Sequence, residues 1–80
     1  MRVRVRLFAV LRERAGAGEL ALELPAGATV GDAVAALAGC HPALGALRGV
    51  AYAVNQSYAA ADAALNDGDE LALIPPVSGG

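Results

Sequence analysis

The sequence has little of what a small enzyme or an extracellular domain is built from. It contains no tryptophan and no lysine, and it has a single cysteine, Cys40, and a single histidine, His41. One cysteine excludes an intramolecular disulfide and a cysteine-based metal site, so a reducing cytoplasm is the expected compartment. No apolar run has the length of a membrane helix, and Arg2, Arg4 and Arg6 interrupt the apolar block that a signal peptide needs. We therefore expect a cytoplasmic protein with no membrane segment.

Residues that perform acid–base or nucleophilic chemistry are also scarce. His41 stands between Cys40 and a proline, and adjacent side chains rarely face each other, so we interpret Cys40 as a small apolar filler at a helix end. The acid-rich segment 66–70 lacks the alternating ligand spacing of an EF-hand loop, and segment 16–18 is too short to cradle phosphate. The sequence predicts no metal site, no bound cofactor and no catalysis by this chain alone.

Charge is unevenly distributed along the 80 residues, whose formal net charge is -2. Residues 1–14 carry five arginines against one acid, whereas residues 15–80 carry one arginine against seven acids. Because the chain as a whole is acidic, we expect the arginines to be neutralised within the fold and predict no nucleic-acid partner.

Alternating polar and apolar residues predict strands at 2–8 and 19–24, joined by a short helical connection at 9–15. Val3, Val5 and Leu7 share one face of the first strand. Antiparallel pairing of the two strands sets glutamates against arginines on the opposite, outer face. The length of the chain fits one small domain.

A single main helix follows the second strand. Thr29 and Asp32 have the spacing of a capping box, and the helix is predicted over 30–38, with Gly39 at its C-terminal cap and His41-Pro42 preventing its continuation. Its buried stripe is predicted to be Val30, Val34, Leu37 and Ala38. Three more strands are predicted at 50–54, 58–60 and 70–74, after which Pro75 and Pro76 end the sheet.

One helix must cover one face of a mixed sheet of four to five strands, because the leucine faces of the strands need a common cover. This α+β layout, with the helix between the second and third strands, is the β-grasp arrangement. We predict a β-grasp domain over residues 1–76 and a flexible tail over 77–80.

The uncovered face of the sheet is a predicted docking surface. Strand parity places Phe8 and Ile74 on that face, side by side if the first and last strands are neighbours, and Tyr58 joins them from the short fourth strand. Exposed apolar side chains that gather in this way mark interaction sites. The alternative is that Phe8 caps the edge of the core.

The Val-Ser-Gly-Gly ending, after Pro75-Pro76, is either a frayed end or a functional tail. Two glycines can enter a channel too narrow for any Cβ, and the prolines lower the entropy lost on insertion. From Pro75 to Gly80 the chain reaches roughly 20 Å, enough to enter the active site of a partner. The useful group would be the carboxylate of Gly80.

Three segments carry a resemblance to a known family: Leu7-Phe8-Ala9 with Leu11-Arg12-Glu13 and Gly16, then Ala53-Val54-Asn55-Gln56, and above all residues 68–80. The chain resembles the small subunits of molybdopterin synthase, which are ubiquitin-like sulfur carriers with a β-grasp fold. The resemblance runs over the whole chain and is most specific in its last thirteen residues.

The resemblance implies a carrier chemistry centred on Gly80. An E1-like activating enzyme would use ATP to adenylate the Gly80 carboxylate, and a sulfur donor would convert it to a thiocarboxylate. The tail would then deliver sulfur to cyclic pyranopterin monophosphate in the large synthase subunit, forming the dithiolene of molybdopterin. Two copies of each subunit and catalytic residues on the large subunit are implied as well. The implied contacts with the partner are Phe8, Arg12, Tyr58, Ile74, Pro75, Pro76, Val77, Ser78 and Gly79.

Other functions stay open. Thiocarboxylate carriers for thiazole synthesis, tRNA thiolation or cysteine synthesis would share the fold and the Gly-Gly ending, although the Pro-Pro-Val-Ser-Gly-Gly segment favours molybdopterin. A ubiquitin-like modifier would join Gly80 to lysines of target proteins, and the absence of lysine excludes chains linked through its own side chains. A plain interaction domain with an incidental ending is the third possibility.

Overall fold

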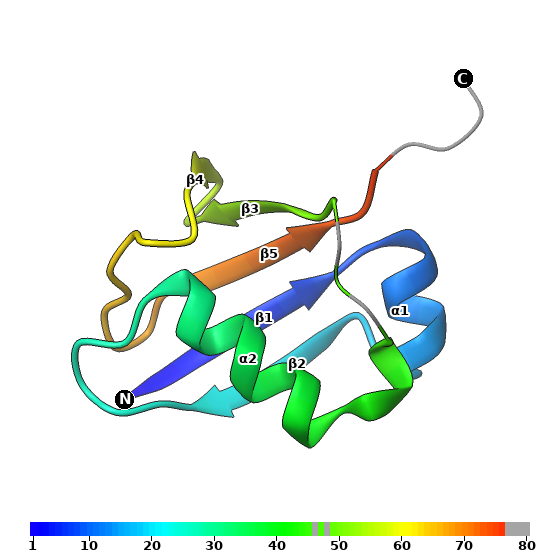
Figure 1. The fold of residues 1–80 in the computed structure, drawn as a ribbon, viewed down its shortest axis with the longest axis horizontal. Helices are drawn as coiled ribbons and strands as arrows, with labels where there is room; N and C mark the ends of the chain where they lie inside the picture. The colour runs from blue at the N-terminus through cyan, green and yellow to red at the C-terminus, as the bar shows by residue number, and fades with distance from the viewer. Residues whose placement is uncertain (46, 48, 77–80) are drawn as a thin grey trace.

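The computed structural model describes residues 1–45, 47 and 49–76 and shows a five-stranded mixed sheet with one long helix on one face (Figure 1). The elements in chain order are β1 (Arg2–Leu7), α1 (Ala9–Ala15), β2 (Glu19–Glu23), α2 (Val30–Cys40), the 3-10 turn η1 (Pro42–Leu44), β3 (Ala51–Val54), β4 (Ser57–Ala59) and β5 (Glu70–Ile74).

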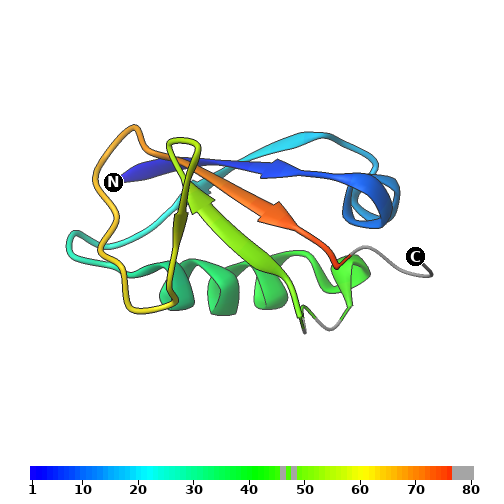
Figure 2. The same cartoon turned by 90° about the horizontal axis from the view of Figure 1, so that it is seen from above.

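The strand order is β2-β1-β5-β3-β4, in which β1 and β5 are parallel and the other neighbours antiparallel. Seen from above, α2 runs along one side of the sheet and no helix of the described residues lies over the other side (Figure 2). The α+β β-grasp prediction is confirmed. The predicted tail, Val77 to Gly80, lies outside the described residues, so its division from the domain stays a prediction.

The core lies between α2 and the sheet. On β1 the burial pattern alternates strictly, and Val3, Val5 and Leu7 point inward, as the sequence predicts. Leu71 and Leu73 of β5 are fully buried beside them. Each aliphatic side chain removed from water in this way stabilises the fold by roughly 1.5–3 kcal/mol.

The start of α2 is as predicted. The Thr29 hydroxyl accepts a hydrogen bond from the Asp32 N–H (3.2 Å), and the Asp32 carboxylate accepts one from the Thr29 N–H (2.9 Å). This reciprocal capping box satisfies two N–H groups that a helix start would leave unpaired.

The predicted end of α2 is wrong. The helix continues through Gly39 to Cys40, and the His41 N–H still donates to the Leu37 carbonyl oxygen (2.8 Å). The stop is set by Pro42, which disfavours a helical conformation at the residue before it. Cys40 is exposed, so its interpretation as an apolar filler is also wrong.

The predicted buried stripe of α2 is wrong at one position. Val30 and Leu37 are buried as predicted, but Ala33 is buried and Ala38 is exposed. Ala33 lies three residues after Val30 and four before Leu37, so it shares their face. Val34 is half-buried beside it.

Four of the five strands differ by one residue from the prediction. β2 is Glu19–Glu23 rather than 19–24, and β3 is Ala51–Val54 rather than 50–54. β1 ends at Leu7, and Phe8, predicted as the last strand residue, is instead the extended cap residue of α1. β4 is Ser57–Ala59 rather than 58–60, because Asn55 and Gln56 both take positive φ values (49° and 71°) and close a two-residue hairpin before Ser57.

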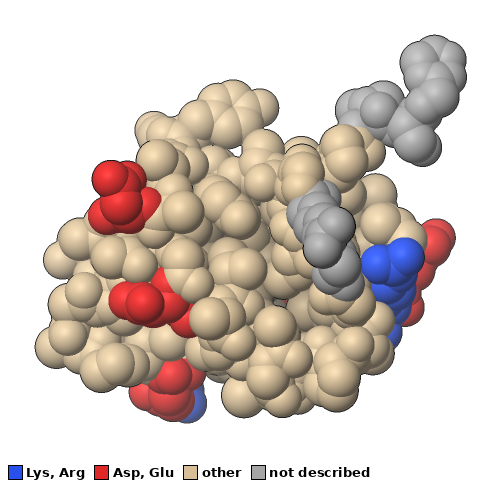
Figure 3. Space-filling view, viewed as in Figure 1, with Lys and Arg blue, Asp and Glu red and all other residues tan. Residues whose placement is uncertain are grey.

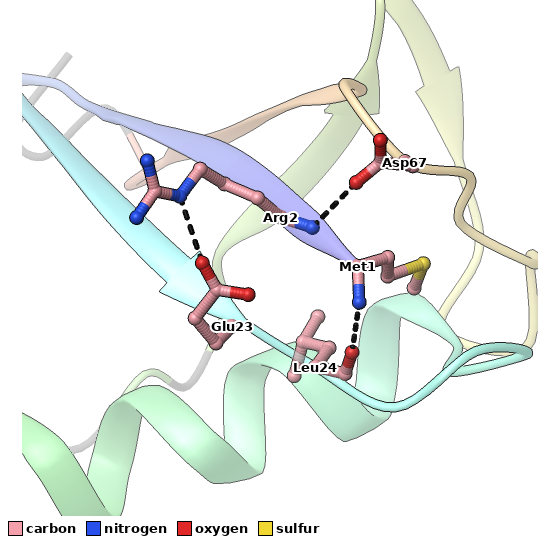
Figure 4. A network of polar contacts seen from close by, with 5 residues as sticks. All are labelled: Met1, Arg2, Glu23, Leu24 and Asp67. Atoms are coloured by element: carbon pink, nitrogen blue, oxygen red, sulfur yellow. Dashed lines mark hydrogen bonds and ion pairs between the residues drawn. The ribbon is translucent and has the colours of Figure 1, made fainter.

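The arginines of β1 are neutralised in part by neighbouring strands. Figure 4 shows the Arg2 Nε–Glu23 Oε1 ion pair (2.8 Å), the Arg2 N–H donating to Asp67 (2.7 Å) and the Met1 ammonium donating to the Leu24 carbonyl oxygen (2.6 Å). These contacts fix the N-terminal end of β1 between its neighbours.

On the α2 side of the molecule, acidic side chains lie mainly toward the end where the chain begins, and few cations are visible (Figure 3). Among the described residues, no helix is long and apolar enough to cross a membrane.

Candidate docking face

The sheet face opposite α2 is organised by strand register. Directly paired residues of neighbouring strands point to the same side of a sheet, so each row of partners shares one face. One row of partners crosses four strands on the uncovered face: Arg6, Ala72, Ala53 and Tyr58. In the next row toward the end of β5, Ile74 is paired with Ala51.

These rows form a shallow apolar hollow of about 280 Å³. Ala53 and Ala72 are nearly buried at its floor, although they lie on the uncovered face. Phe8, 38% exposed, and Tyr58, 82% exposed, stand with Ile74 around them. The structure therefore brings the three predicted apolar residues together, and Phe8 does not cap the core. The full lining is Arg6, Phe8, Ala53, Gln56, Tyr58, Glu70, Ala72 and Ile74.

The charged side chains that line the apolar hollow are Arg6 and Glu70. The Arg6 guanidinium carbon lies 5.5 Å from the centre of the Phe8 ring, a cation–π distance. An Nη atom of Arg6 lies 3.8 Å from the Glu70 carboxylate. Arg6 thus faces both the aromatic wall and the acid of the hollow.

Arg12 lies on the other side of Phe8, outside the apolar hollow. It projects from α1 and lines a second depression, of about 380 Å³, together with Arg6, Phe8 and Ala9. The Arg12 Nε atom would lie 3.4 Å from a Cβ built on Gly18, so the side chain passes directly over that glycine. The predicted contact Arg12 is therefore adjacent to the hollow through Phe8.

The chain leaves the sheet beside the apolar hollow. Pro75 is half-buried and Pro76 exposed, and both directly follow Ile74. The remaining predicted site residues, Val77, Ser78, Gly79 and Gly80, lie outside the described residues.

Sequence reasoning missed five residues of the hollow. Parity could have found three of them, because Arg6 shares the face of Phe8, and Glu70 and Ala72 share the face of Ile74. Ala53 and Gln56 depend on the register between β3, β4 and β5, which the chain pattern does not give.

The described residues include no group of three or more His, Cys, Asp or Glu side chains able to hold a metal ion. What they present is a surface suited to contact with another protein: an apolar hollow, an aromatic wall and flanking arginines.

Comparison with known proteins shows which family the chain belongs to. The model of the ThiS family matches residues 5–80, nearly the whole chain. The chain belongs to the ThiS family. It is 43% identical, over 100% of both chains, to the molybdopterin synthase sulfur carrier subunit of Chlamydomonas reinhardtii.

The chain is also similar to two further proteins, whose names indicate different functions. The chain is 45% identical to small archaeal modifier protein 1 of Haloferax volcanii over 94% of this chain and 97% of the relative. A crystal structure of that protein matches with a TM-score of 0.91, 40% identity and 100% coverage of both chains. A chain from the complex of subunits 1 and 2 of the molybdopterin-converting factor of Helicobacter pylori matches with a TM-score of 0.70, 27% identity and full coverage of both chains.

Proposed function

We propose that this ThiS-family chain is the sulfur carrier subunit of a cytoplasmic molybdopterin synthase. The observation that carries the proposal is the 43% identity, over the full length of both chains, to a molybdopterin synthase sulfur carrier subunit. The similarity to a chain from a two-subunit complex of the molybdopterin-converting factor supports a partner subunit. We expect two copies of each subunit in the assembly, and neither nucleic acid nor membrane as a partner.

The proposed chemistry takes place at the carboxylate of Gly80. A carboxylate oxygen attacks the α-phosphorus of ATP on an E1-like enzyme, pyrophosphate leaves, and an acyl adenylate forms. Hydrosulfide released by the sulfur donor then attacks the acyl carbon and AMP leaves, which yields a thiocarboxylate. Adenylation is needed because an oxide ion is a poor leaving group and AMP a good one.

The proposed acceptor is cyclic pyranopterin monophosphate in the large subunit, where the sulfur becomes part of the dithiolene. In this scheme the chain is a tethered cosubstrate and binds no cofactor itself. ATP is used by the activating enzyme, and the catalytic residues belong to the large subunit.

The proposed docking uses the hollow and the segment that follows it. Phe8, Tyr58 and Ile74 would contact the large subunit, with Arg12 at the flank of Phe8. Because Pro75 and Pro76 directly follow Ile74, docking at the hollow would hold the start of the segment Pro75 to Gly79 against the same partner.

The first test measures sulfur loading. Incubated with its activating enzyme, ATP and sulfide, the chain should gain the mass of an oxygen-to-sulfur exchange, located on Gly80 by fragmentation. Deletion of Gly80 should abolish sulfur transfer to the pterin substrate, while a thermal melt confirms that the shortened chain is folded. An unchanged mass, with the enzyme active on another carrier, would contradict the proposal, as would a gene that continues past Gly80.

The similarity to small archaeal modifier protein 1 favours a second function, conjugation of Gly80 to lysines of other proteins. A tagged chain expressed in its native cells would then be recovered with Gly80 in amide linkage to target lysines. The modifier would be favoured if the conjugates disappear on Gly80 deletion, if the intact chain carries no thiocarboxylate, and if the deletion strain makes normal amounts of molybdopterin. Loss of molybdopterin in that strain would favour the carrier.

A further inference from the structure

Three arginines share the uncovered face of β1, and they differ in what they contact. Arg2 is paired with Glu23 at 2.8 Å. Arg6 is paired with Glu70 at 3.8 Å and lies over Phe8. Within residues 1–45, 47 and 49–76, the exposed Arg4 side chain forms neither an ion pair nor a hydrogen bond.

Arg4 lines a polar hollow of about 170 Å³ with Asn55, Gln56 and Glu70. The Asn55 amide already makes two hydrogen bonds, because its Nδ2 donates to Asp69 (3.0 Å) and its Oδ1 accepts from the Glu70 N–H (3.1 Å), which leaves one Nδ2 N–H. Arg4 supplies the positive charge among the described residues of this hollow.

The polar hollow adjoins the apolar hollow, since Gln56 and Glu70 line both. Arg4 lies two residues from Arg6 in β1 and four from Phe8, the extended residue that follows the strand, which corresponds to roughly 7 Å and 13 Å at the rise of a strand. Arg4 and Glu70 are also direct partners in the β1–β5 register. A single partner surface that fills the apolar hollow would therefore also cover Arg4.

Arg4 is the unpaired cation on this part of the face. Arg6 has two acids beside it, Glu70 within ion-pair distance and Glu19 opposite it in the β1–β2 register, whereas among the described residues Arg4 is within ion-pair distance of neither. Covering an unpaired guanidinium with protein removes its water, which is costly unless the partner supplies an acceptor, and a carboxylate supplies the strongest one.

We propose that Arg4 is a specificity-determining residue of the docking face, and that it binds a carboxylate of the partner protein beside the apolar side chain that fills the hollow. This inference rests on the proposed function for the existence of the partner, and it adds the chemistry by which that partner is recognised. The partner surface is expected to carry an aliphatic or aromatic side chain with an aspartate or glutamate on the order of 7–13 Å away.

The test compares Arg4→Glu with Arg2→Glu in binding to the purified large synthase subunit. The two substitutions make the same charge change on the same face of the same strand. Each also places a glutamate opposite a glutamate, because Arg2 is paired with Glu23 and Arg4 with Glu70. Of these two positions, only position 4 lines the polar hollow that adjoins the apolar one. Arg2→Glu therefore controls both for net charge and for cross-strand repulsion.

Arg4→Glu is expected to weaken binding about tenfold or more at roughly 50 mM NaCl, and less at roughly 500 mM, because salt screens the charge pair. Arg2→Glu should remain within about threefold of the wild type. If Arg4→Glu does not fold, Arg4→Gln removes the charge at similar length and should still weaken binding.

The inference would be overturned if Arg4→Glu and Arg2→Glu weaken binding equally. The proposed function would still stand in that case, provided that the wild type binds and Phe8→Ala binds more weakly. No binding by the folded wild type would instead count against the proposed function. A salt-sensitive dimer of the chain alone, lost in Arg4→Glu, would assign the carboxylate to a second copy and overturn the assignment to the partner subunit.

Discussion

Strand β5 presents two faces with different roles. Leu71 and Leu73 point toward α2 and are fully buried, whereas Ala72 and Ile74 point away from it and line an open hollow. The same five-residue strand thus contributes to the core on one side and to a candidate binding surface on the other. The difference arises because α2 covers one face and no element of the described chain covers the other (Figure 2). Truncating a large side chain on the inner face should therefore lower stability, whereas truncating one on the outer face should weaken binding.

The largest effect on folding is expected for Leu71→Ala. Removing a fully buried leucine side chain leaves a cavity, so the unfolding free energy should fall by roughly 2–5 kcal/mol. Below its melting temperature, the variant should bind the large subunit as the wild type does. Leu71→Met, which roughly conserves volume, should lose less than about 1.5 kcal/mol. Chemical denaturation and a binding titration measure the two quantities, and weak binding with normal stability would mean that the two faces are assigned the wrong way round.

The reverse pattern is expected for Phe8→Ala combined with Ile74→Ala. Binding to the large subunit should weaken by about 2–4 kcal/mol, because both side chains stand around the hollow. Stability should fall less than in Leu71→Ala, since both side chains already meet water. Val10→Ala is the matched control, because Val10 is 39% exposed, almost the same as Phe8, but does not line the hollow. Equal loss of binding in the control would argue against a localised docking site.

Much of the inner face could be predicted, because a buried face requires apolar residues at the regular spacing of the strand or helix that carries it. The alternation over β1 fixes Val3, Val5 and Leu7 as inward residues. On α2 the same reasoning failed at Ala33 and Ala38, since two alanines of equal hydrophobicity flank the same stripe and only packing decides which one is covered. The end of α2 was placed two residues too early because the turn preference of Gly39 was given more weight than the block that His41-Pro42 sets beyond it.

The outer face could be predicted less completely. Strand parity placed Phe8 and Ile74 on this face. Parity shows which face a side chain is on, but it does not show which residues of other strands lie beside it. The hollow exists because register sets Ala72 beside Ala53 and Ala53 beside Tyr58, so two small side chains form a floor. Residues 53 and 72 are far apart in sequence, and their pairing depends on β3 docking next to β5, which no local pattern encodes.

The smallest effect, and the sharpest test of the separation between the faces, is expected at Thr29. Its hydroxyl and the Asp32 carboxylate cap the start of the helix that covers the inner face. Thr29→Ala should lower the unfolding free energy by about 1 kcal/mol, because the Asp32 N–H loses its acceptor. Thr29→Ser keeps a hydroxyl and should lose less. Neither variant should change binding to the large subunit, since Thr29 lies on the side of the sheet remote from the hollow and does not line it. Weakened binding at temperatures where both variants are folded would show that the covering helix and the docking face are coupled through the sheet, and the two faces of β5 could then no longer be treated as independent.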